Sequence, residues 1–286
     1  MFSHLHFESW GLNAQLPTLL SDAGRLLPVT FGYKTIYDEA EYYGGSTKKI
    51  DRMRKMVGFW KRRVADKTTT PSDLAYNAAQ NLIKDMNIDK STIDALVFVV
   101  QQPDVINPAT AYFLHDKLGL SKDCIATDIN QGCAGWVFGL HMVSQMIESG
   151  AYKKVLLLNG DTPSVSLDKS DRNSAPIFGD GGSATLVEYS EDKIASFYSI
   201  ETVSFGFEAI VPPFSGARFG LHSIIQRDED FELLTKLRNE KIVMPTGNEV
   251  PLLGAYLDGI SVFDFTIKVV PKNIKELLDF VKLTPN

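Results

Sequence analysis

The sequence Asp128-Ile-Asn-Gln-Gly-Cys-Ala-Gly-Trp136 lies between a strand-like run at 124–129 and a helix-like run at 137–147. Cys133 is therefore expected on a glycine-flanked turn at the start of a helix, where backbone N–H groups and the helix dipole favour a thiolate. Because the thiolate is the nucleophilic form of cysteine, the turn is a candidate centre for acyl transfer through a thioester. The alternative for a lone cysteine is a buried structural residue, and Cys124 in the strand-like run fits that description.

Strand and helix patterns alternate on both sides of this turn. Thr70 is a suitable N-cap, Pro71 fits the first helical position and Asp73 fits the third. A helix is therefore predicted over 70–86. Further strands are predicted at 93–100, 124–129, 154–158 and 183–189, and further helices at 108–118 and 137–147. This alternation indicates an α/β fold with a parallel sheet.

Two helical segments have distinctive patterns. The run at 137–147 carries apolar residues on almost every side, which predicts a central helix that is buried all round and ends at Gly150. The run at 259–280 predicts a long helix that Pro271 kinks or splits. Residues 194–203 have a strand pattern, whereas residues 1–45 and 221–250 show no clear period.

The bulk composition narrows the classes of function. The 286 residues are 44% hydrophobic and 22% charged, as in an ordinary soluble globular protein. A net charge of −6 and a pI of about 5.4 argue against a nucleic-acid binder. Two cysteines make no disulfide framework, so a reducing, cytoplasmic compartment is expected. No apolar run reaches the roughly 18 residues of a membrane span and no signal-peptide pattern opens the chain, so no membrane partner is expected.

Two polar loops are candidates for ligand contacts. Phe178-Gly-Asp-Gly-Gly-Ser183 lacks the Lys-Ser/Thr ending of a P-loop, so a structural turn against the active-site floor is the favoured interpretation over a phosphate cradle. Arg172, in Asp168-Lys-Ser-Asp-Arg172, is either a solvated surface residue or a phosphate ligand. The histidines lack the spacing of metal ligands, and His141 lies about two helical turns from Cys133, too far to act as its base.

Residues 48–63 form a basic cluster in an acidic protein. The cluster holds Lys48, Lys49, Arg52, Arg54, Lys55, Lys61, Arg62 and Arg63, with only Asp51 of opposite charge. One interpretation is an exposed helix face with i,i+4 charge pairs. The other is a docking patch for an anionic partner, either nucleotide phosphates or an acidic carrier protein.

Taken in order, these motifs resemble the ketoacyl-acyl-carrier-protein synthase III family of the thiolase superfamily. The matching segments are 57–62, 70–86, 108–120, 128–136, 149–150, 168–172, 178–182 and 257–263. The resemblance covers about residues 46–286. The ordered series is far more specific than any single motif.

The resemblance implies a thiolase-like layered α/β/α/β/α fold. Its N-terminal half, at 1–190, would carry the nucleophile, and 191–286 would begin a C-terminal half that is incomplete. It implies that Cys133 takes an acyl group from acyl-CoA or an acyl carrier protein. Malonyl-carrier protein then loses CO2, and its carbanion attacks the acyl-enzyme, as in fatty-acid or related biosynthesis. A homodimer in the cytoplasm is expected, with no covalently bound cofactor and no metal.

The same resemblance points to residues that bind CoA. Arg172 matches a position near the CoA phosphates, and Arg52 stands where the family has an aromatic residue that clamps the adenine. Trp60 and Arg62, in a neighbouring matching segment, are further candidates. Asn107 stands where the family has a bulky residue before the pocket proline, which implies a different acyl pocket.

The family's other catalytic residues have no match in the chain. Its histidine, its asparagine and the glycine-rich loop of its oxyanion hole fall beyond Asn286, so the natural protein is expected to be longer. Two alternatives stay open at this point. The chain transfers the acyl group to an amine or hydroxyl acceptor, or it is a non-condensing thiolase-like half that only binds or dimerises.

Overall fold

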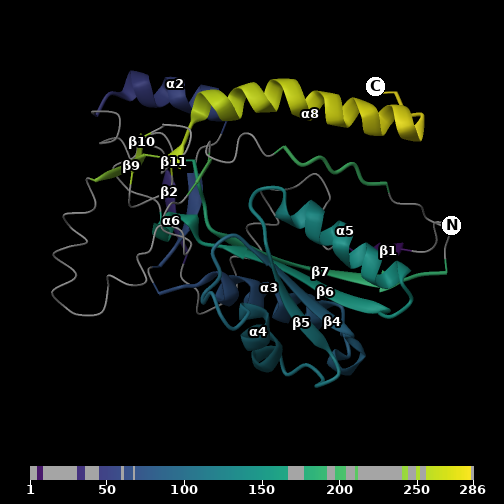
Figure 1. Cartoon of the computed structure of the whole chain (residues 1–286). Coiled ribbons are helices and arrows are strands. Elements are labelled where there is room, and N and C mark those ends of the chain that lie inside the picture. Colours follow the sequence, from purple (N-terminus) through teal and green to yellow (C-terminus); the bar gives the residue numbers. More distant parts are fainter. Residues whose placement is uncertain are drawn as a thin grey trace. The chain divides into compact units, whose positions relative to one another are not determined.

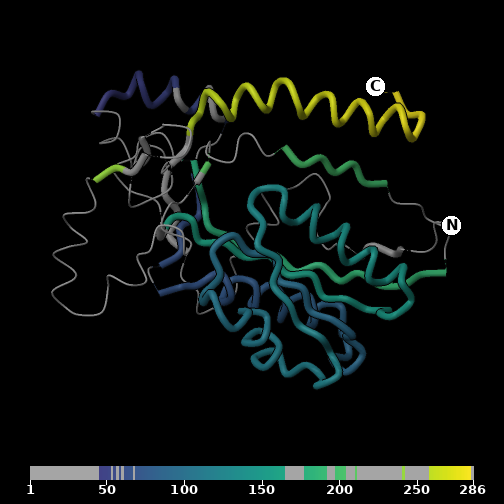
Figure 2. The backbone as a smooth tube through the Cα atoms, in the orientation of Figure 1, coloured from purple at the N-terminus to yellow at the C-terminus, as the bar shows by residue number. Residues whose placement is uncertain are grey.

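The computed structural model describes residues 5–8, 31–35, 45–58, 61–66, 68–166, 177–191, 197–203, 210–211, 240–243, 249–251 and 256–284. The chain divides into two compact units, the first comprising Met1–Val165 with Phe178–Ser196 and the second Ser166–Ile177 with Phe197–Asn286. Cys133 belongs to the first unit. Figure 1 labels the helices and strands of the chain, and Figure 2 traces its backbone in the same orientation. The assignment of 1–190 and 191–286 as two thiolase-like halves stays a prediction.

A five-stranded mixed sheet forms the centre of the first unit. Its strands lie in the order β1 (Leu5–Glu8), β7 (Gly181–Tyr189), β6 (Lys154–Asp161), β4 (Ala95–Val100) and β5 (Ile125–Asn130). Strands β5, β4 and β6 are parallel, whereas β7 is antiparallel to β6 and β1 to β7. The predicted parallel sheet is confirmed for β5, β4 and β6, and the antiparallel β7 and β1 extend it on one side. The described residues between β6 and β7 form only the four-residue helix α6 (Pro163–Ser166), not a crossover helix.

Helices cover both faces of this sheet (Figure 1). Helices α3 (Pro71–Asp85) and α4 (Thr110–Leu118) pack on one face, and α5 (Gly135–Glu148) packs on the other. Successive residues of β4 alternate between the two cores, with Leu96, Phe98 and Val100 on the first face and Ala95, Val97 and Val99 on the second. All of β4 is buried, because helices cover the sheet on both sides.

Helix α3 begins as the sequence predicts. The Thr70 Oγ1 accepts a hydrogen bond from the Asp73 N–H at 3.3 Å, and the Asp73 carboxylate accepts one from the Thr70 N–H at 3.2 Å. This capping box, with Pro71 in the first turn, satisfies N–H groups that no helical carbonyl reaches.

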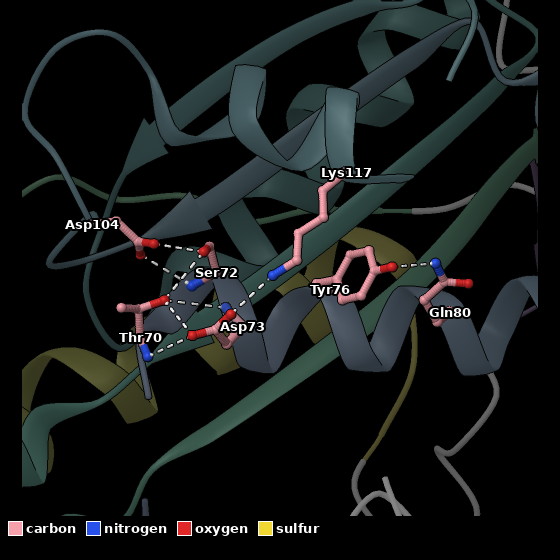
Figure 3. A network of polar contacts seen from close by, with 7 residues as sticks. All are labelled: Thr70, Ser72, Asp73, Tyr76, Gln80, Asp104 and Lys117. Atoms are coloured by element: carbon pink, nitrogen blue, oxygen red, sulfur yellow. Dashed lines mark hydrogen bonds and ion pairs between the residues drawn. The ribbon is translucent and has the colours of Figure 1, made fainter. Parts of the chain in front are cut away.

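A polar network connects α3 with its neighbours (Figure 3). Lys117 of α4 forms an ion pair of 3.0 Å with Asp73 and lies 4.6 Å from the ring centroid of Tyr76. The Ser72 hydroxyl donates to Asp104 at 2.5 Å, and the Ser72 N–H donates to the same carboxylate at 3.1 Å. The network therefore fixes the loop after β4 to the start of α3.

Two helices differ from their predictions. Helix α4 begins at Thr110, two residues after Pro108, because the Asp128 carboxylate of β5 accepts hydrogen bonds from the N–H of Thr110 and of the next residue, at 2.7 and 2.8 Å. Helix α5 is not buried all round. Val137 is 49% exposed and Met142 is 40% exposed, since only the opposite face of α5 packs on the sheet.

The second unit contains short strand pairs and one long helix. The antiparallel pairs are β8 (Ile210–Val211) with β11 (Tyr256–Leu257) and β9 (Lys241–Val243) with β10 (Glu249–Pro251). Helix α8 (Gly259–Val281) is not split at Pro271, which removes a single N–H donor from it. Residues 197–203, predicted as strand, form none. None of the described helices is long and apolar enough to cross a membrane.

Candidate active site

The carboxyl ends of the three parallel strands meet at one edge of the sheet. Strand β5 ends at Asn130 and leads into the Cys133 turn, β4 leads into Gln101, and β6 ends at Asp161. In open α/β sheets, ligands bind at this edge. The parallel register therefore brings the loops that carry Cys133, Gln101 and Asp161 to one place.

The Cys133 turn is closed by its own backbone. The Gly135 N–H donates to the Gly132 carbonyl at 2.7 Å, and α5 starts at Gly135. The N-cap residue Ala134 has no side chain that accepts a hydrogen bond, and no acidic residue stands in the first turn. The first N–H groups of α5 are thus without a side-chain cap, and they favour negative charge beside Cys133.

Close packing fixes the start of α5 on the sheet. A Cβ at Gly135 would lie 2.7 Å from Val99 Cγ1, and a Cβ at Gly139 would lie 2.7 Å from Val99 Cγ2. Only glycine allows the helix to approach β4 this closely. The Trp136 Nε1 donates to the Thr185 Oγ1 at 3.3 Å and connects the same turn of helix with β7.

Polar contacts around Gln101 connect the three strand ends. The Asp161 Oδ1 accepts from the Gln101 N–H at 3.0 Å and from the Gln102 N–H at 3.4 Å, and the Asn130 Nδ2 donates to the Gln101 carbonyl at 2.9 Å. The Gln101 Oε1 would lie 3.3 Å from a Cβ at Gly132. Burial raises the pKa of Asp161 to about 6, although its two backbone hydrogen bonds act in the opposite direction.

The two cysteines lie in different environments. Cys133 is exposed, whereas Cys124 is 5% exposed and packs in the core beneath α3 and α4. Burial, with a smaller effect from the charge of Asp94, raises the pKa of Cys124 to about 11. The prediction that Cys124 is a core residue is confirmed.

The glycine-rich loop before β7 is a structural turn. Asp180, itself 5% exposed, accepts hydrogen bonds from the Ala65 N–H of β3 (Lys61–Ala65) at 2.7 Å and from the Ser164 N–H at 3.0 Å. A Cβ at Gly182 would lie 2.5 Å from the backbone of α3. These contacts agree with the structural interpretation of the loop and hold β3 beside the end of β6.

Comparisons with known proteins identify the family. Residues 127–206, which include the Cys133 turn, match the family model of 3-oxoacyl-[acyl-carrier-protein (ACP)] synthase III. A Campylobacter jejuni protein assigned as a 3-oxoacyl-[acyl-carrier-protein] synthase 3 is 36% identical over 249 residues, which are 87% of this chain and 66% of that protein. The chain belongs to the 3-oxoacyl-[acyl-carrier-protein] synthase III family.

Two solved structures of 3-oxoacyl-(acyl-carrier-protein) synthases agree with this assignment. A 3-oxoacyl-(acyl-carrier protein) synthase from Burkholderia xenovorans is 29% identical with a TM-score of 0.71, over 88% of this chain and 66% of that one. A 3-oxoacyl-(acyl-carrier-protein) synthase III is 25% identical with a TM-score of 0.74, over 90% of this chain and 74% of that one. The predicted thiolase-like α/β fold is confirmed. The chain spans about two thirds of the length of the curated Campylobacter relative.

The predicted CoA-binding residues lie in different settings. The Arg62 Nη1 donates to the Phe178 carbonyl at 2.8 Å, so part of its guanidinium holds β3 to the loop before β7. Arg52 is exposed on the helix that precedes β3. Trp60 and Arg172 lie outside the described residues. The CoA-binding roles of all four stay predictions.

The sequence interpretation missed Gln101 and Asp161 as residues of the site. Gln101 directly follows β4, and Asp161 is the last residue of β6. These positions could have been recognised from the sequence, because the carboxyl ends of parallel strands meet at one edge of the sheet. Asn130 lies in the Cys133 motif but had no assigned role. Within the described part of the chain, no group of three or more His, Cys, Asp or Glu side chains could hold a metal ion.

Proposed function

We propose that Cys133 is the acyl-accepting nucleophile of a 3-oxoacyl-[acyl-carrier-protein] synthase III. The position of Cys133 supports this proposal. Its thiol is exposed at the N-terminus of α5, at the carboxyl edge of three parallel strands, inside the region that matches the family model. Cys124 offers no competing nucleophile, because it is buried and burial raises its pKa.

In the first half-reaction, the Cys133 sulfur attacks the thioester carbonyl of acyl-CoA or of an acyl carrier protein. The new carbon–sulfur bond forms as the bond to the donor sulfur breaks. The acyl group passes to Cys133, and the departing donor thiolate takes up the proton that Cys133 gives up. Negative charge develops on the carbonyl oxygen, toward which the uncapped N–H groups of α5 can donate. One such donor typically contributes about 2.7–4 kcal/mol to lowering the barrier.

In the second half-reaction, malonyl-carrier protein loses CO2 and its carbanion attacks acyl-Cys133. The new carbon–carbon bond forms as the carbon–sulfur bond to Cys133 breaks, and the products are CO2, a 3-oxoacyl-carrier protein and the Cys133 thiolate, which takes up a proton from solvent. The family resemblance assigns assistance in decarboxylation to a histidine and an asparagine that match no residue of this sequence. Condensation, and with it a role in fatty-acid or related biosynthesis, is therefore proposed for the whole protein.

Acyl-CoA and acyl carrier protein are the proposed substrates, without a metal or a covalently bound cofactor. Arg52, Arg62, Trp60 and Arg172 are the proposed CoA-binding residues. Arginine suits this role because its planar guanidinium pairs with phosphate oxygens. The cytoplasm is the proposed location, because both cysteines are free thiols, which a reducing compartment maintains.

A homodimer through β5 is also part of the proposal. Strand β5 ends the sheet, and no described strand pairs with its outer edge. Tyr112 and Phe113 of α4 are 57% and 52% exposed, and Ile125 of β5 is 42% exposed. An open edge beside exposed apolar side chains is typical of a surface that another chain covers. A monomer by analytical ultracentrifugation at micromolar concentration would contradict this part.

Incubation with an acyl-CoA and malonyl-carrier protein tests the reaction. The expected result for the 286-residue chain is acyl-Cys133 with little CO2 release, because the decarboxylating residues have no match in it. Acyl-Cys133 that is consumed by an added amine or alcohol, without CO2, would assign an amine or hydroxyl acceptor instead. Absence of acyl-Cys133 with every acyl donor would overturn the proposed function and leave only a binding or dimerising role.

A further inference from the structure

The last residue of β6, Asp161, holds the loop that follows β4. Its Oδ1 accepts hydrogen bonds from two successive backbone N–H groups, that of Gln101 at 3.0 Å and that of Gln102 at 3.4 Å. The backbone pairing of β4 with β6 ends before this point, at Val99 and Asn159. The carboxylate therefore continues the connection between the two strands beyond their last paired residues.

Gln101 passes this connection on to the Cys133 turn through two other groups. Its carbonyl accepts a hydrogen bond of 2.9 Å from the Nδ2 of Asn130, the last residue of β5. Its side-chain Oε1 would lie 3.3 Å from a Cβ at Gly132, so it occupies space that the missing side chain leaves open. Asp161 is therefore connected, through one residue, to two points of the turn.

The turn has few anchors of its own. Residues 131–134 are exposed, and the N-cap residue Ala134 makes no side-chain hydrogen bond. Helix α5 itself is fixed to the sheet, because Gly135 packs closely on Val99. The position of the Cys133 sulfur relative to the first N–H groups of α5 therefore depends on contacts from the neighbouring strand ends.

A second carboxylate joins the same two strands at the opposite edge of the sheet. Asp94, the residue before β4, accepts hydrogen bonds from the successive N–H groups of Lys153 at 2.7 Å and Lys154 at 2.9 Å. The six residues of β4, about 20 Å of extended chain, separate this contact from that of Asp161. Asp94 thus has the same kind of contact as Asp161 but lies at the edge away from Cys133.

We propose that Asp161, acting through Gln101, is a positioning residue that holds the Cys133 sulfur at the N-terminus of α5 for acyl transfer. This inference rests on the proposed function and adds two positioning residues to its site. The effect on rate can be large, since a displacement of about 1 Å in a reacting group can lower the rate about a hundredfold.

The test follows acylation of Cys133 by mass spectrometry over a range of acyl-CoA concentrations. Asp161→Ala and Gln101→Ala should each lower the maximal rate constant at least about tenfold and leave the half-saturating concentration within about twofold, because the geometry of attack changes and donor binding does not. The double variant should be no slower than the slower single variant, since the two residues act as a unit. Asp161→Asn should stay within about threefold of the wild type, because its Oδ1 still accepts both N–H groups.

Asp94→Ala is the matched control for loss of stability. It leaves the N–H groups of Lys153 and Lys154 without their acceptor, so urea unfolding should show a loss comparable with that of Asp161→Ala. Its maximal rate constant should stay within about twofold of the wild type. An equal fall in rate in this control, no fall in Asp161→Ala, an Asn variant as slow as the Ala variant, or multiplied losses in the double variant would each overturn the inference.

Alkylation by iodoacetamide needs no acyl donor and keeps the inference testable if the proposed function fails. The N–H groups of α5 favour the Cys133 thiolate only while the sulfur lies beside them. At pH 7.5 we expect alkylation of Cys133 to be at least about threefold slower in Asp161→Ala than in the wild type or in Asp94→Ala. Should no donor acylate Cys133, this difference would leave the positioning role standing without the proposed function, and equal alkylation rates in the three chains would overturn both.

Discussion

The Asp161 carboxylate accepts a hydrogen bond of 3.0 Å from the backbone N–H of Gln101, which joins the end of β6 to the loop after β4. The side chain of Gln101 in turn lies beside Gly132, the residue before Cys133. A half-buried carboxylate therefore supports the loop that flanks the nucleophile. Burial raises the pKa of Asp161 to about 6. At neutral pH the carboxylate is therefore charged in surroundings that disfavour the charged form. Such groups are common at functional sites.

Replacing Asp161 by Asn should stabilise the fold at neutral pH. The pKa of Asp161 is about 6 in the folded protein, against an ordinary value of 3.8. The folded state therefore keeps the proton to a higher pH than the unfolded state, and the free energy of unfolding falls as the pH rises from about 4 to about 6. The Asn Oδ1 still accepts the N–H bonds but carries no charge. We expect the free energy of unfolding to rise by about 1–3 kcal/mol near pH 7 and to change little near pH 4. Urea unfolding at both pH values checks this, and a gain that is equal at both would contradict it.

Gly139→Ala should destabilise the protein by overpacking. The added Cβ would lie 2.7 Å from Val99 Cγ2 and 3.0 Å from Leu157 Cδ1, both in the buried core. We expect a loss of about 1–3 kcal/mol in urea unfolding, partly recovered when Val99→Ala is added. Gly181→Ala is the control, because a Cβ there meets nothing within 4 Å. Additive effects of Gly139→Ala and Val99→Ala would argue against the contact.

Asp180→Ala should weaken the attachment of β3 to the loop before β7. The substitution leaves the Ala65 N–H and the Ser164 N–H without their acceptor. A loss of about 2–4 kcal/mol is expected, and Asp180→Asn should lose less because one carbonyl acceptor remains. Amide hydrogen exchange locates the effect. Exchange at Ala65 should accelerate in the Ala variant more than exchange in β4, and uniform acceleration would indicate a global effect instead.

Iodoacetamide should distinguish the two cysteines. Cys133 is exposed, whereas Cys124 is 5% exposed and has its pKa raised to about 11, so little thiolate forms there at neutral pH. We expect Cys133 to be alkylated at least about a hundredfold faster near pH 7.5, with the difference lost in denaturant. Peptide mapping after timed quenching gives both rates. Comparable rates in the folded protein would contradict the burial of Cys124.

Sequence patterns predicted the helices and strands that depend on residues close together in the chain. The capping box of Thr70 and Asp73 begins α3 where expected, and the apolar run of β4 is a fully buried strand. Contacts between distant segments were not predictable in this way. The start of α4 depends on Asp128 of another element, and the antiparallel return of β7 depends on pairing with β6.

The same difference separates the residues of the candidate site that were predicted from those that were missed. Cys133 was identified because its glycine-flanked turn is local in sequence, and the family resemblance followed from such motifs. Asp161 is 60 residues from its partner Gln101, and only the parallel register of β4 and β6 brings them together. Exposure of Val137 on α5 was also missed, because hydrophobicity alone does not say which face of a helix packs on the sheet.

The most direct test of Cys133 as the acyl-accepting nucleophile is mass spectrometry of the chain after incubation with acyl-CoAs of increasing chain length. We expect an added acyl mass on the peptide that contains Cys133, none on the peptide that contains Cys124, and no adduct in Cys133→Ala. Cys124→Ala is the control and should be acylated like the wild type. An acyl adduct that persists in Cys133→Ala, or a folded wild-type chain that takes up no acyl group from any donor, would contradict it.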